Sequence, residues 1–368
     1  MKFLNKMFLT LAACLVLSAC DDSNEPDPTP EGDDFPLVED GTSTLLVLCS
    51  GMWNQNNSSL FRYSFETGTS VSDYFLAENG RGLGDTANDM GIYGSKIYIV
   101  VNESNTVEIV DRTTGKSLKQ LSMVDDENGA RQPRSVAFYK NKAYVCSFDG
   151  TVARIDTTSL NIDGWITCGR NPDDLCVQDG KLYVANSGGL DYMEPIGVDR
   201  TVSVVDLNTF SEIKKIEVGP NPGKILPGPG HSVYVVTRGA LSTAEDYHLV
   251  KIDTSADVCA EIYDVHPENF AIYENRAYLY RYDYTTSESE IAVFNLESGQ
   301  MEREDFITDG TKINTPSSIE VNPVSGNVYI TDANAYMASS DILSFSPEGT
   351  LNGRLDRIGV SAICIAFE

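Results

Sequence analysis

The side chains that most often perform catalysis or bind metals are sparse in this chain of 368 residues. Only three histidines are present, His231, His248 and His266, which leaves little room for a histidine-built metal site or catalytic triad. The sequence contains no HExxH motif, no phosphate-binding loop, no GxGxxG that opens a helix and no GxSxG at a strand-to-helix turn. We therefore expect no enzymatic activity and no bound metal.

A cysteine near the N-terminus stands in a setting that favours lipidation. Leu17-Ser18-Ala19-Cys20 matches the bacterial lipobox, and the apolar run before it, 7–17, is too short to span a bilayer. We expect residues 1–19 to be a lipoprotein signal peptide and Cys20 to carry the lipid. The alternative is an ordinary secretory signal with a coincidental cysteine. Residues 20–42 are acidic and rich in proline, and we expect them to form an extended tether.

The net charge excludes whole classes of partner. Acidic residues outnumber basic residues 54 to 27, and the formal net charge is −27. Phosphate backbones and anionic lipid headgroups would repel such a chain, so we expect no nucleic-acid binding and no electrostatic docking on membranes.

Aromatic and arginine side chains gather in long polar segments, and such groups on projecting loops are typical of binding surfaces. The alternative for any one of them is that it packs its own loop. The residues that we expect to contact a ligand are Trp53, Asn54, Arg81, Arg134, Tyr192, Arg238, Tyr284 and Tyr336.

A repeated strand pattern must position these loops. A small residue or lysine, an apolar residue, a tyrosine and further apolar residues recur around Tyr98, Tyr144, Tyr183, Tyr234, Tyr278 and Tyr329, and a seventh copy places Leu46 at the tyrosine position. Each copy is followed by an alternating strand and a turn, and no stretch has a convincing helical period. About 47 residues per copy predicts four strands per repeat, so we expect residues 43–368 to form an all-β, seven-bladed β-propeller.

The two ends of this region complement each other. SAICIAFE at 361–368 reads as a first strand without a following blade, and TLLVLCSG at 44–51 reads as a second strand without a first. We expect the N- and C-terminal strands to share one blade and so remove the open sheet edges.

Several acidic residues lie in the segments between repeats. Asp85, Asp89, Asp173, Asp174 and Glu268 could converge near the propeller axis and serve calcium binding or catalysis. The alternative, which we favour, is that such residues close turns through side-chain hydrogen bonds to the backbone. Six cysteines follow Cys20, mostly at strand positions, and we interpret them as buried free thiols; Cys168 and Cys176 would be the pair if a disulfide forms.

The repeats resemble those of the YncE-like seven-bladed propellers. The stretches NGRGLGDTANDM (79–90) and LCSGMWNQNNSSL (48–60), with the lipobox and the acids after Cys20, resemble Bacteroidota surface propeller lipoproteins, among them the cobalamin-binding BtuG group. The resemblance implies a lipid-anchored outer-membrane protein that faces the cell exterior, captures cobalamin (vitamin B12) and passes it to a BtuB-like TonB-dependent transporter. The alternatives are a glycan- or protein-binding surface propeller and a propeller enzyme of the lactonase or lyase type.

Overall fold

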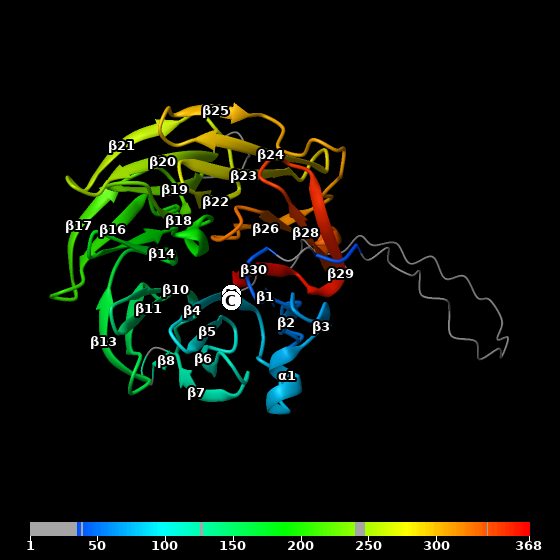
Figure 1. Cartoon of the computed structure of the whole chain (residues 1–368). Helices are drawn as coiled ribbons and strands as arrows, with labels where there is room; N and C mark the ends of the chain where they lie inside the picture. The colour runs from blue at the N-terminus through cyan, green and yellow to red at the C-terminus, as the bar shows by residue number, and fades with distance from the viewer. Residues whose placement is uncertain (1–34, 38–39, 126, 128, 240–246, 337) are drawn as a thin grey trace, which may run out of the picture. The chain divides into compact units, whose positions relative to one another are not determined.

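Seven four-stranded antiparallel sheets form a ring of blades, as the repeats predict (Figure 1). The structure is a computed structural model that describes residues 35–37, 40–125, 127, 129–239, 247–336 and 338–368. The predicted signal peptide, Cys20 and most of the predicted tether lie outside the described residues. Among the described residues, no helix is both long and apolar enough to span a bilayer.

In blades 2 to 7 the strands follow the chain order from the axis outward, and in blade 1 the last strand of the chain takes the innermost place. Blade 1 contains β30 (Ala362–Phe367), β1 (Thr44–Cys49), β2 (Ser59–Ser64) and β3 (Thr69–Val71). Blade 2 contains β4 (Ala87–Tyr93), β5 (Lys96–Val101), β6 (Thr106–Asp111) and β7 (Ser117–Ser122). Blade 3 contains β10 (Pro133–Tyr139), β11 (Lys142–Ser147), β12 (Thr151–Asp156) and β13 (Asn161–Thr167). Blade 4 contains β14 (Pro172–Gln178), β15 (Lys181–Asn186), β16 (Thr201–Asp206) and β17 (Ser211–Glu217).

Blade 5 contains β18 (Pro222–Gly228), β19 (Ser232–Arg238), β20 (Tyr247–Asp253) and β21 (Val258–Tyr263). Blade 6 contains β22 (Asn269–Tyr273), β23 (Arg276–Asp283), β24 (Glu288–Asn295) and β25 (Gln300–Arg303). Blade 7 contains β26 (Pro316–Val321), β27 (Val328–Asp332), β28 (Ser339–Phe345) and β29 (Leu351–Val360). The remaining elements are α1 (Tyr74–Asn79), the short ribbon of β8 (Val124–Asp125) and β9 (Gly129–Ala130), and the 3₁₀ turns η1 (Gly189–Asp191) and η3 (Asn334–Tyr336).

The first strand of each blade lies innermost, and these inner strands follow one another around the axis (Figure 1). The ring closes through β30, which pairs with β1 in the register Leu45↔Phe367 and Val47↔Ile365. This confirms the predicted shared blade. Closure leaves each inner strand between two neighbours and removes the open edge that an incomplete ring would expose.

The repeated tyrosines lie on the second strand of their blades and fill the space between blades. Tyr98, Tyr144, Tyr183, Tyr234, Tyr278 and Tyr329 are all at most 2% exposed. Second strands are buried on both faces, so they read as continuous apolar runs, whereas outer strands such as β7 and β17 are mostly exposed. Burial therefore decreases from the second strand of a blade to its rim.

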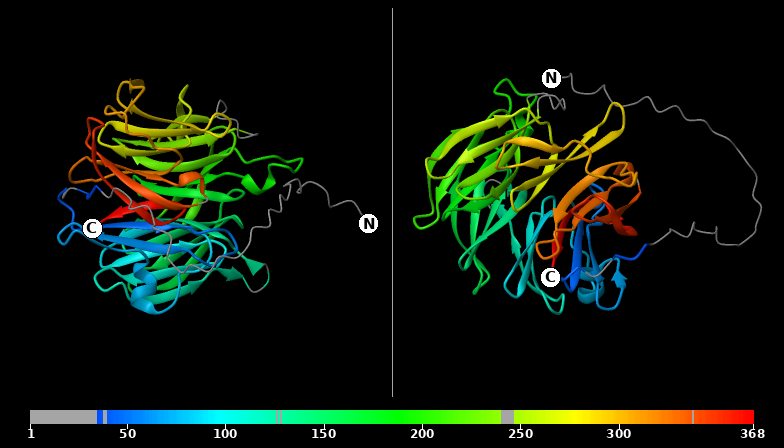
Figure 2. Two further views of the ribbon diagram at one scale, coloured as in Figure 1. Left: turned by 90° about the vertical axis from the view of Figure 1, so that its right-hand side faces the viewer. Right: turned by 45° about the horizontal axis from the view of Figure 1, so that its top comes forward.

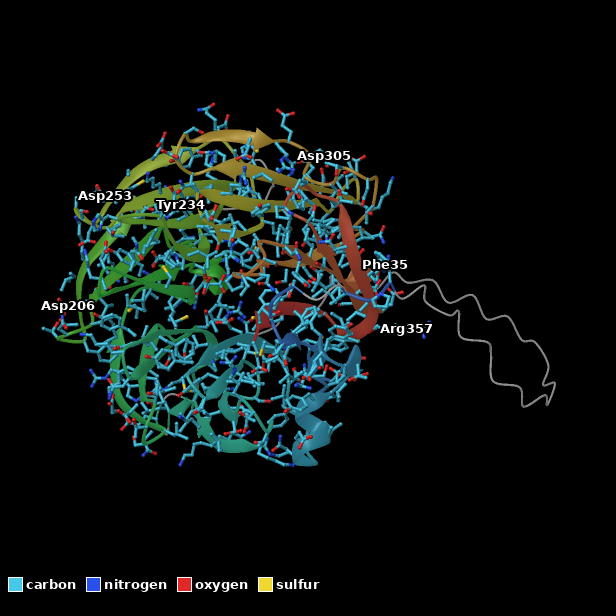
Figure 3. The ribbon with its side chains drawn as sticks, in the orientation of Figure 1. Phe35, Asp206, Tyr234, Asp253, Asp305 and Arg357 are labelled. Atoms are coloured by element: carbon cyan, nitrogen blue, oxygen red, sulfur yellow. The ribbon has the colours of Figure 1, made fainter. Side chains whose placement is uncertain are left out.

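Polar residues at the end of the third strand form the turn to the outer strand. The carboxylate of Asp206 accepts hydrogen bonds from the backbone N–H groups of Asn208 and Thr209 at 2.8 and 3.0 Å, and Asp156 and Asp253 occupy the same position in their blades. These side chains replace backbone partners that a tight turn cannot supply. Figure 3 shows Asp206 and Asp253 at the periphery of the ring.

Two features differ from the sequence-based expectation. The short helix α1 has no helical period, because six residues are too few to show one; Asp73 caps its N-terminus and Gly80, at φ 67°, ends it. The folded region also begins before residue 43. Phe35, labelled in Figure 3, forms a β-bridge with Arg354 of β29. Leu37 is 6% exposed, and Asp40 accepts a hydrogen bond from the Tyr329 hydroxyl.

Candidate ligand-binding site

A cavity of about 540 Å³ opens at one end of the propeller axis, and residues from all seven blades line it. We call it the axial cavity. Its floor and walls come from the first residues of the inner strands, and its rim comes from the connections that follow the second strands. Its volume is in the range that binds small molecules.

A short repeated motif positions the cavity side chains. Five inner strands begin at or near a Pro-x-x triplet, whose third residue is Ser135, Asp174, Lys224, Asn269 or Ser318. Proline is tolerated there because it is the first residue of the strand. Four of these strands, and β4 before Asp89, shift register directly after the first residue, and such irregularities redirect side chains. All five third residues line the axial cavity, as do Asp89 and Cys364, which hold the equivalent position in the other two blades.

Two arginines from different blades hold one buried carboxylate in the cavity wall. Arg134 donates to Oδ1 of Asp173 from Nε at 3.0 Å and from Nη2 at 2.8 Å, and Arg238 donates to Oδ2 from Nη2 at 2.6 Å. Burial opposes ionisation of Asp173, but the two guanidinium groups prevail and lower its pKa to about 2. Asp173 therefore joins blades 3, 4 and 5 as a fixed charge.

A glycine makes room for one of these arginines. A Cβ on Gly223 would lie 2.8 Å from Cζ of Arg238, closer than side-chain contacts allow. A larger second residue in the blade 5 triplet would have to push the Arg238 guanidinium away from this place, which gives the glycine of Pro-Gly-Lys at 222–224 a physical reason.

A second charged group lies around Ser135 and Lys224. The Ser135 hydroxyl lies 2.7 Å from Oδ2 of Asp89 and 2.6 Å from Oδ1 of Asp174, and Nζ of Lys224 lies 3.7 Å from Oδ2 of Asp174. Burial raises the pKa of Asp89. A hydroxyl has one proton, so Ser135 donates to one of these carboxyl oxygens at a time, while the backbone N–H of Val136 also donates to Oδ2 of Asp89 at 2.8 Å.

Lys224 stays charged in this setting. Burial alone would lower its pKa, but the carboxylates of Asp174, Asp89 and Glu320 outweigh that effect and raise the pKa above its ordinary value. Burial in turn raises the pKa of Glu320. The floor of the axial cavity therefore presents an ammonium group among carboxyl groups, and it offers both donors and acceptors to a ligand.

Glu268 contributes to the wall of the cavity from the connection that leads into blade 6. The Tyr284 hydroxyl donates to its Oε1 at 3.0 Å, while Oε2 is buried without a hydrogen-bond partner among the described residues. Burial raises the pKa of Glu268. Because an unpaired buried carboxylate oxygen is costly, Oε2 is a position where a ligand donor would be favourable.

The eight predicted contact residues fall into three groups. Arg134 and Arg238 line the axial cavity, and Tyr284 adjoins it through Glu268. Trp53, Asn54, Tyr192 and Tyr336 lie on connections after second strands; the exposed fractions of Trp53 and Tyr192 are 69% and 60%. In the side view of Figure 2 the green connection with η1, which leads to Tyr192, extends beyond the strands.

The structure does not bring Arg81 to the cavity. Its guanidinium lies 3.0 Å from the carboxylate of Glu108 and 3.1 Å from the Ser117 hydroxyl, over the ring of Phe75. Glu108 is a buried acid in β6, so Arg81 compensates a charge inside blade 2.

Of the five acids that could converge near the axis, Asp89, Asp173, Asp174 and Glu268 do line the axial cavity. Asp85 instead accepts the backbone N–H groups of Asn54 and Asn56 and closes their loop. Lys224 and Glu320 were not identified from the sequence. The recurring Pro-x-x triplets are the signal that would have pointed to Lys224. The six cysteines of the described region are free thiols, as we interpreted them.

Comparisons with known proteins give a family for the chain and two solved structures with a similar fold. No curated protein matches the chain. A quinoprotein alcohol dehydrogenase-like protein from Bacteroides thetaiotaomicron is similar in structure, with a TM-score of 0.64 and 18% identity over 89% of this chain and 79% of that one. Hydrazine synthase from Kuenenia stuttgartiensis is similar with a TM-score of 0.58 and 15% identity over 71% of this chain and 77% of that one. Identities this low show the fold alone. The family model described as a domain of unknown function, DUF5074, matches residues 44–347, and the chain therefore belongs to that family.

Proposed function

We propose that this protein is a surface-exposed outer-membrane lipoprotein that captures cobalamin on the face around the axial cavity and passes it to a BtuB-like TonB-dependent transporter. The observation that carries the proposal is the mixture of fixed donors and acceptors in the cavity beneath exposed aromatic side chains on the rim. The family resemblance of the 48–60 and 79–90 segments supports the choice of ligand.

The charges of the axial cavity suit a nearly neutral ligand rich in amides. Five acidic and three basic side chains line it. An anionic ligand would meet Asp89, Asp174 and Glu320 around the single ammonium of Lys224, whereas amides can donate to the carboxylates and accept from the cations. Cobalamin is a broad disc rimmed by amides, with a nucleotide tail. A cavity of about 540 Å³ takes one edge of such a ligand, so the disc would rest on the rim.

The rim supplies flat contacts for the disc. Trp53, Tyr192 and Tyr284 are each at least 60% exposed although they are large and apolar. Exposed aromatic side chains that surround a concave polar site are typical of binding surfaces, since they gain most from burial when a ligand arrives. The connection around η1 also exposes Leu190, Met193 and Ile196, and we propose this apolar connection as the contact with the transporter.

We propose capture without turnover. The Ser135 hydroxyl contacts two carboxyl groups. Among the described residues, no histidine lies against it to act as the general base that would activate it as a nucleophile. The buried carboxyl of Glu268 is the group in the cavity best suited to acid–base chemistry, but its hydrogen-bond partner is the Tyr284 hydroxyl and not an activated nucleophile. Prolonged incubation of the ligand with the protein should therefore leave the ligand unchanged.

Calorimetric titration of the mature protein with cyanocobalamin tests the proposal. We expect one site per chain, and we expect Trp53→Ala and Tyr284→Ala each to weaken binding about thirtyfold, which corresponds to about 2 kcal/mol. Trp165→Ala is the matched control, because Trp165 lies on the outer strand of blade 3, where Arg131 stacks on it. Absence of binding at micromolar concentrations would refute the cobalamin assignment, and a glycan or protein partner would then become the leading hypothesis.

A further inference from the structure

Two of the three histidines in the chain lie together beside the axial cavity. His248 is the second residue of β20, and His266 lies in the connection from β21 to β22. The strand register brings them together, because Leu249 pairs with Tyr263 and the next position along each strand is His248 and Asp264. One ring nitrogen of each histidine and a carboxylate oxygen of Asp264 lie within 4.8 Å of one another.

The hydrogen bond of His266 fixes which of its nitrogens faces the group. Nδ1 lies 2.7 Å from the backbone carbonyl oxygen of Tyr247, and a carbonyl only accepts, so Nδ1 carries the proton. In the neutral ring Nε2 then has a lone pair, and it lies 3.5 Å from Oδ1 of Asp264, which also has only lone pairs to offer. A proton or a metal ion between the two atoms would satisfy both lone pairs. A backbone carbonyl that holds Nδ1–H is also the usual support of a histidine that binds metal through Nε2.

His248 supplies a second indication. Its Nδ1 is buried and has no hydrogen-bond partner among the described residues. A buried polar nitrogen without a partner is costly, and a bound metal ion is one way to satisfy it. The rings of His248 and His266 are 5.5 Å apart between centroids and are tilted by 56°, so they are not stacked.

We propose that His248, Asp264 and His266 form a binding site for a divalent transition-metal ion of the zinc class. Two imidazole nitrogens and one carboxylate oxygen form a ligand set that zinc uses in open sites. Bond lengths of about 2.0–2.1 Å in a tetrahedral site separate ligand atoms by about 3.4 Å, close to the 3.5 Å between His266 and Asp264. Asp264, whose side chain is 93% exposed, has freedom to adjust.

The ion would have an open coordination position and a defined place in the fold. Three protein ligands leave a fourth position for water or a donor group of a ligand. The site joins the start of β20 to the connection that leads into blade 6, and its sequence neighbours Tyr247 and Glu268 line the axial cavity. The metal would therefore fix one wall of the cavity.

Calorimetry with zinc chloride on the untagged, chelator-treated mature protein tests the site. Excess magnesium chloride in the buffer occupies the many surface carboxylates, and imidazole ligands favour zinc over magnesium. We expect one zinc ion per chain, and we expect His248→Gln, His266→Gln and Asp264→Asn each to weaken binding at least about tenfold. His231→Gln is the matched control, because His231 also pairs with an aspartate, at 2.8 Å from Asp179, but in an exposed turn.

A second measurement guards against variants that misfold. Cobalt(II) in place of zinc gives visible absorption bands whose intensity and position report four-coordinate nitrogen and oxygen ligation. These bands should vanish in His266→Gln. The circular dichroism and the melting transition of this variant in chelator should match those of the wild type. Zinc binding that is unchanged in all three site variants, or no binding above the magnesium background, would overturn the proposal; in the second case a protonated His266 would be the cation that faces Asp264.

Discussion

Replacing Asp173 with asparagine removes one negative charge from the wall of the axial cavity and leaves its shape unchanged. Arg134 and Arg238 both donate to this carboxylate, and Asp173 is 9% exposed. The amide oxygen of asparagine can still accept one of these hydrogen bonds. The variant therefore measures chiefly the charge interaction between the carboxylate and the two guanidinium groups.

The expected loss follows from the pKa of Asp173. A fall from the ordinary value of 3.8 to about 2 is worth about 2.5 kcal/mol of unfolding free energy at pH 7, at 1.36 kcal/mol per pKa unit. Because the folded-state pKa is the lower one, this stability is fully present above the unfolded-state pKa and is lost as the pH falls through the folded-state pKa. At pH 3 the same two values leave about 1.3 kcal/mol.

Urea denaturation of the wild type and Asp173→Asn at pH 7 and pH 3 measures this difference, since urea does not screen ion pairs as guanidinium chloride does. We expect the gap between the two proteins to halve at the lower pH. Asp305→Asn is the control, because Asp305 is exposed and accepts the Ile307 N–H at 3.1 Å, a bond that asparagine can also accept. A difference in unfolding free energy that is equal at both pH values would refute the charge-based reasoning. The absence of any difference at pH 7 would show that the ion pairs of Asp173 do not stabilise the fold.

Three further predictions concern closure, the end of the tether and anchoring. Deletion of residues 360–368 removes β30 and should abolish the single cooperative unfolding transition, so an unchanged melting curve would contradict closure through this strand. Tyr329→Phe should lower the free energy of unfolding, measured by urea denaturation, by about 1–3 kcal/mol, because Asp40 loses the hydroxyl that donates to it at 2.5 Å. Tyr98→Phe is the control and should change the free energy of unfolding little, because the Tyr98 hydroxyl has no partner among the described residues. Cys20→Ala should release the protein from the outer-membrane fraction, and equal membrane retention of the variant and the wild type would exclude lipid anchoring at Cys20.

The sequence predicts the ring well, because each blade repeats the same burial pattern. The tyrosine on the second strand of six blades, and Leu46 in the seventh, fill the same space between blades, so the repeats are visible without any knowledge of contacts. The shared blade was predictable for the same reason, since 44–51 and 361–368 each lack the strand that the other supplies. By contrast, α1 depends on one cap at Asp73 and the burial of Tyr74 and Phe75, and neither repeats elsewhere.

The site was predictable only in part, because its contacts join residues that are distant in the sequence. Arg134, Asp173 and Arg238 come from three blades, and nothing near any of them indicates the other two. Arg81 lies in an equally polar segment, yet Glu108 of its own blade binds it. The grouping of His248 with Asp264 required the register of β20 on β21, which depends on strand boundaries that sequence patterns give only approximately.

The third position of the inner-strand triplet shows how a repeated fold produces a specific site. Seven equivalent backbone positions face the axis, and they carry Asp89, Ser135, Asp174, Lys224, Asn269, Ser318 and Cys364. The same strand geometry places each side chain, so a substitution at one position changes the chemistry of the cavity without changing the ring. A single lysine among the seven, next to two aspartates, breaks the symmetry of the axis, so a ligand bound on this face as we propose would meet different groups in each rotational orientation. Lys224→Met should accordingly weaken cobalamin binding, and it should also lower the melting temperature, because Asp174, Asp89 and Glu320 lose the cation among them.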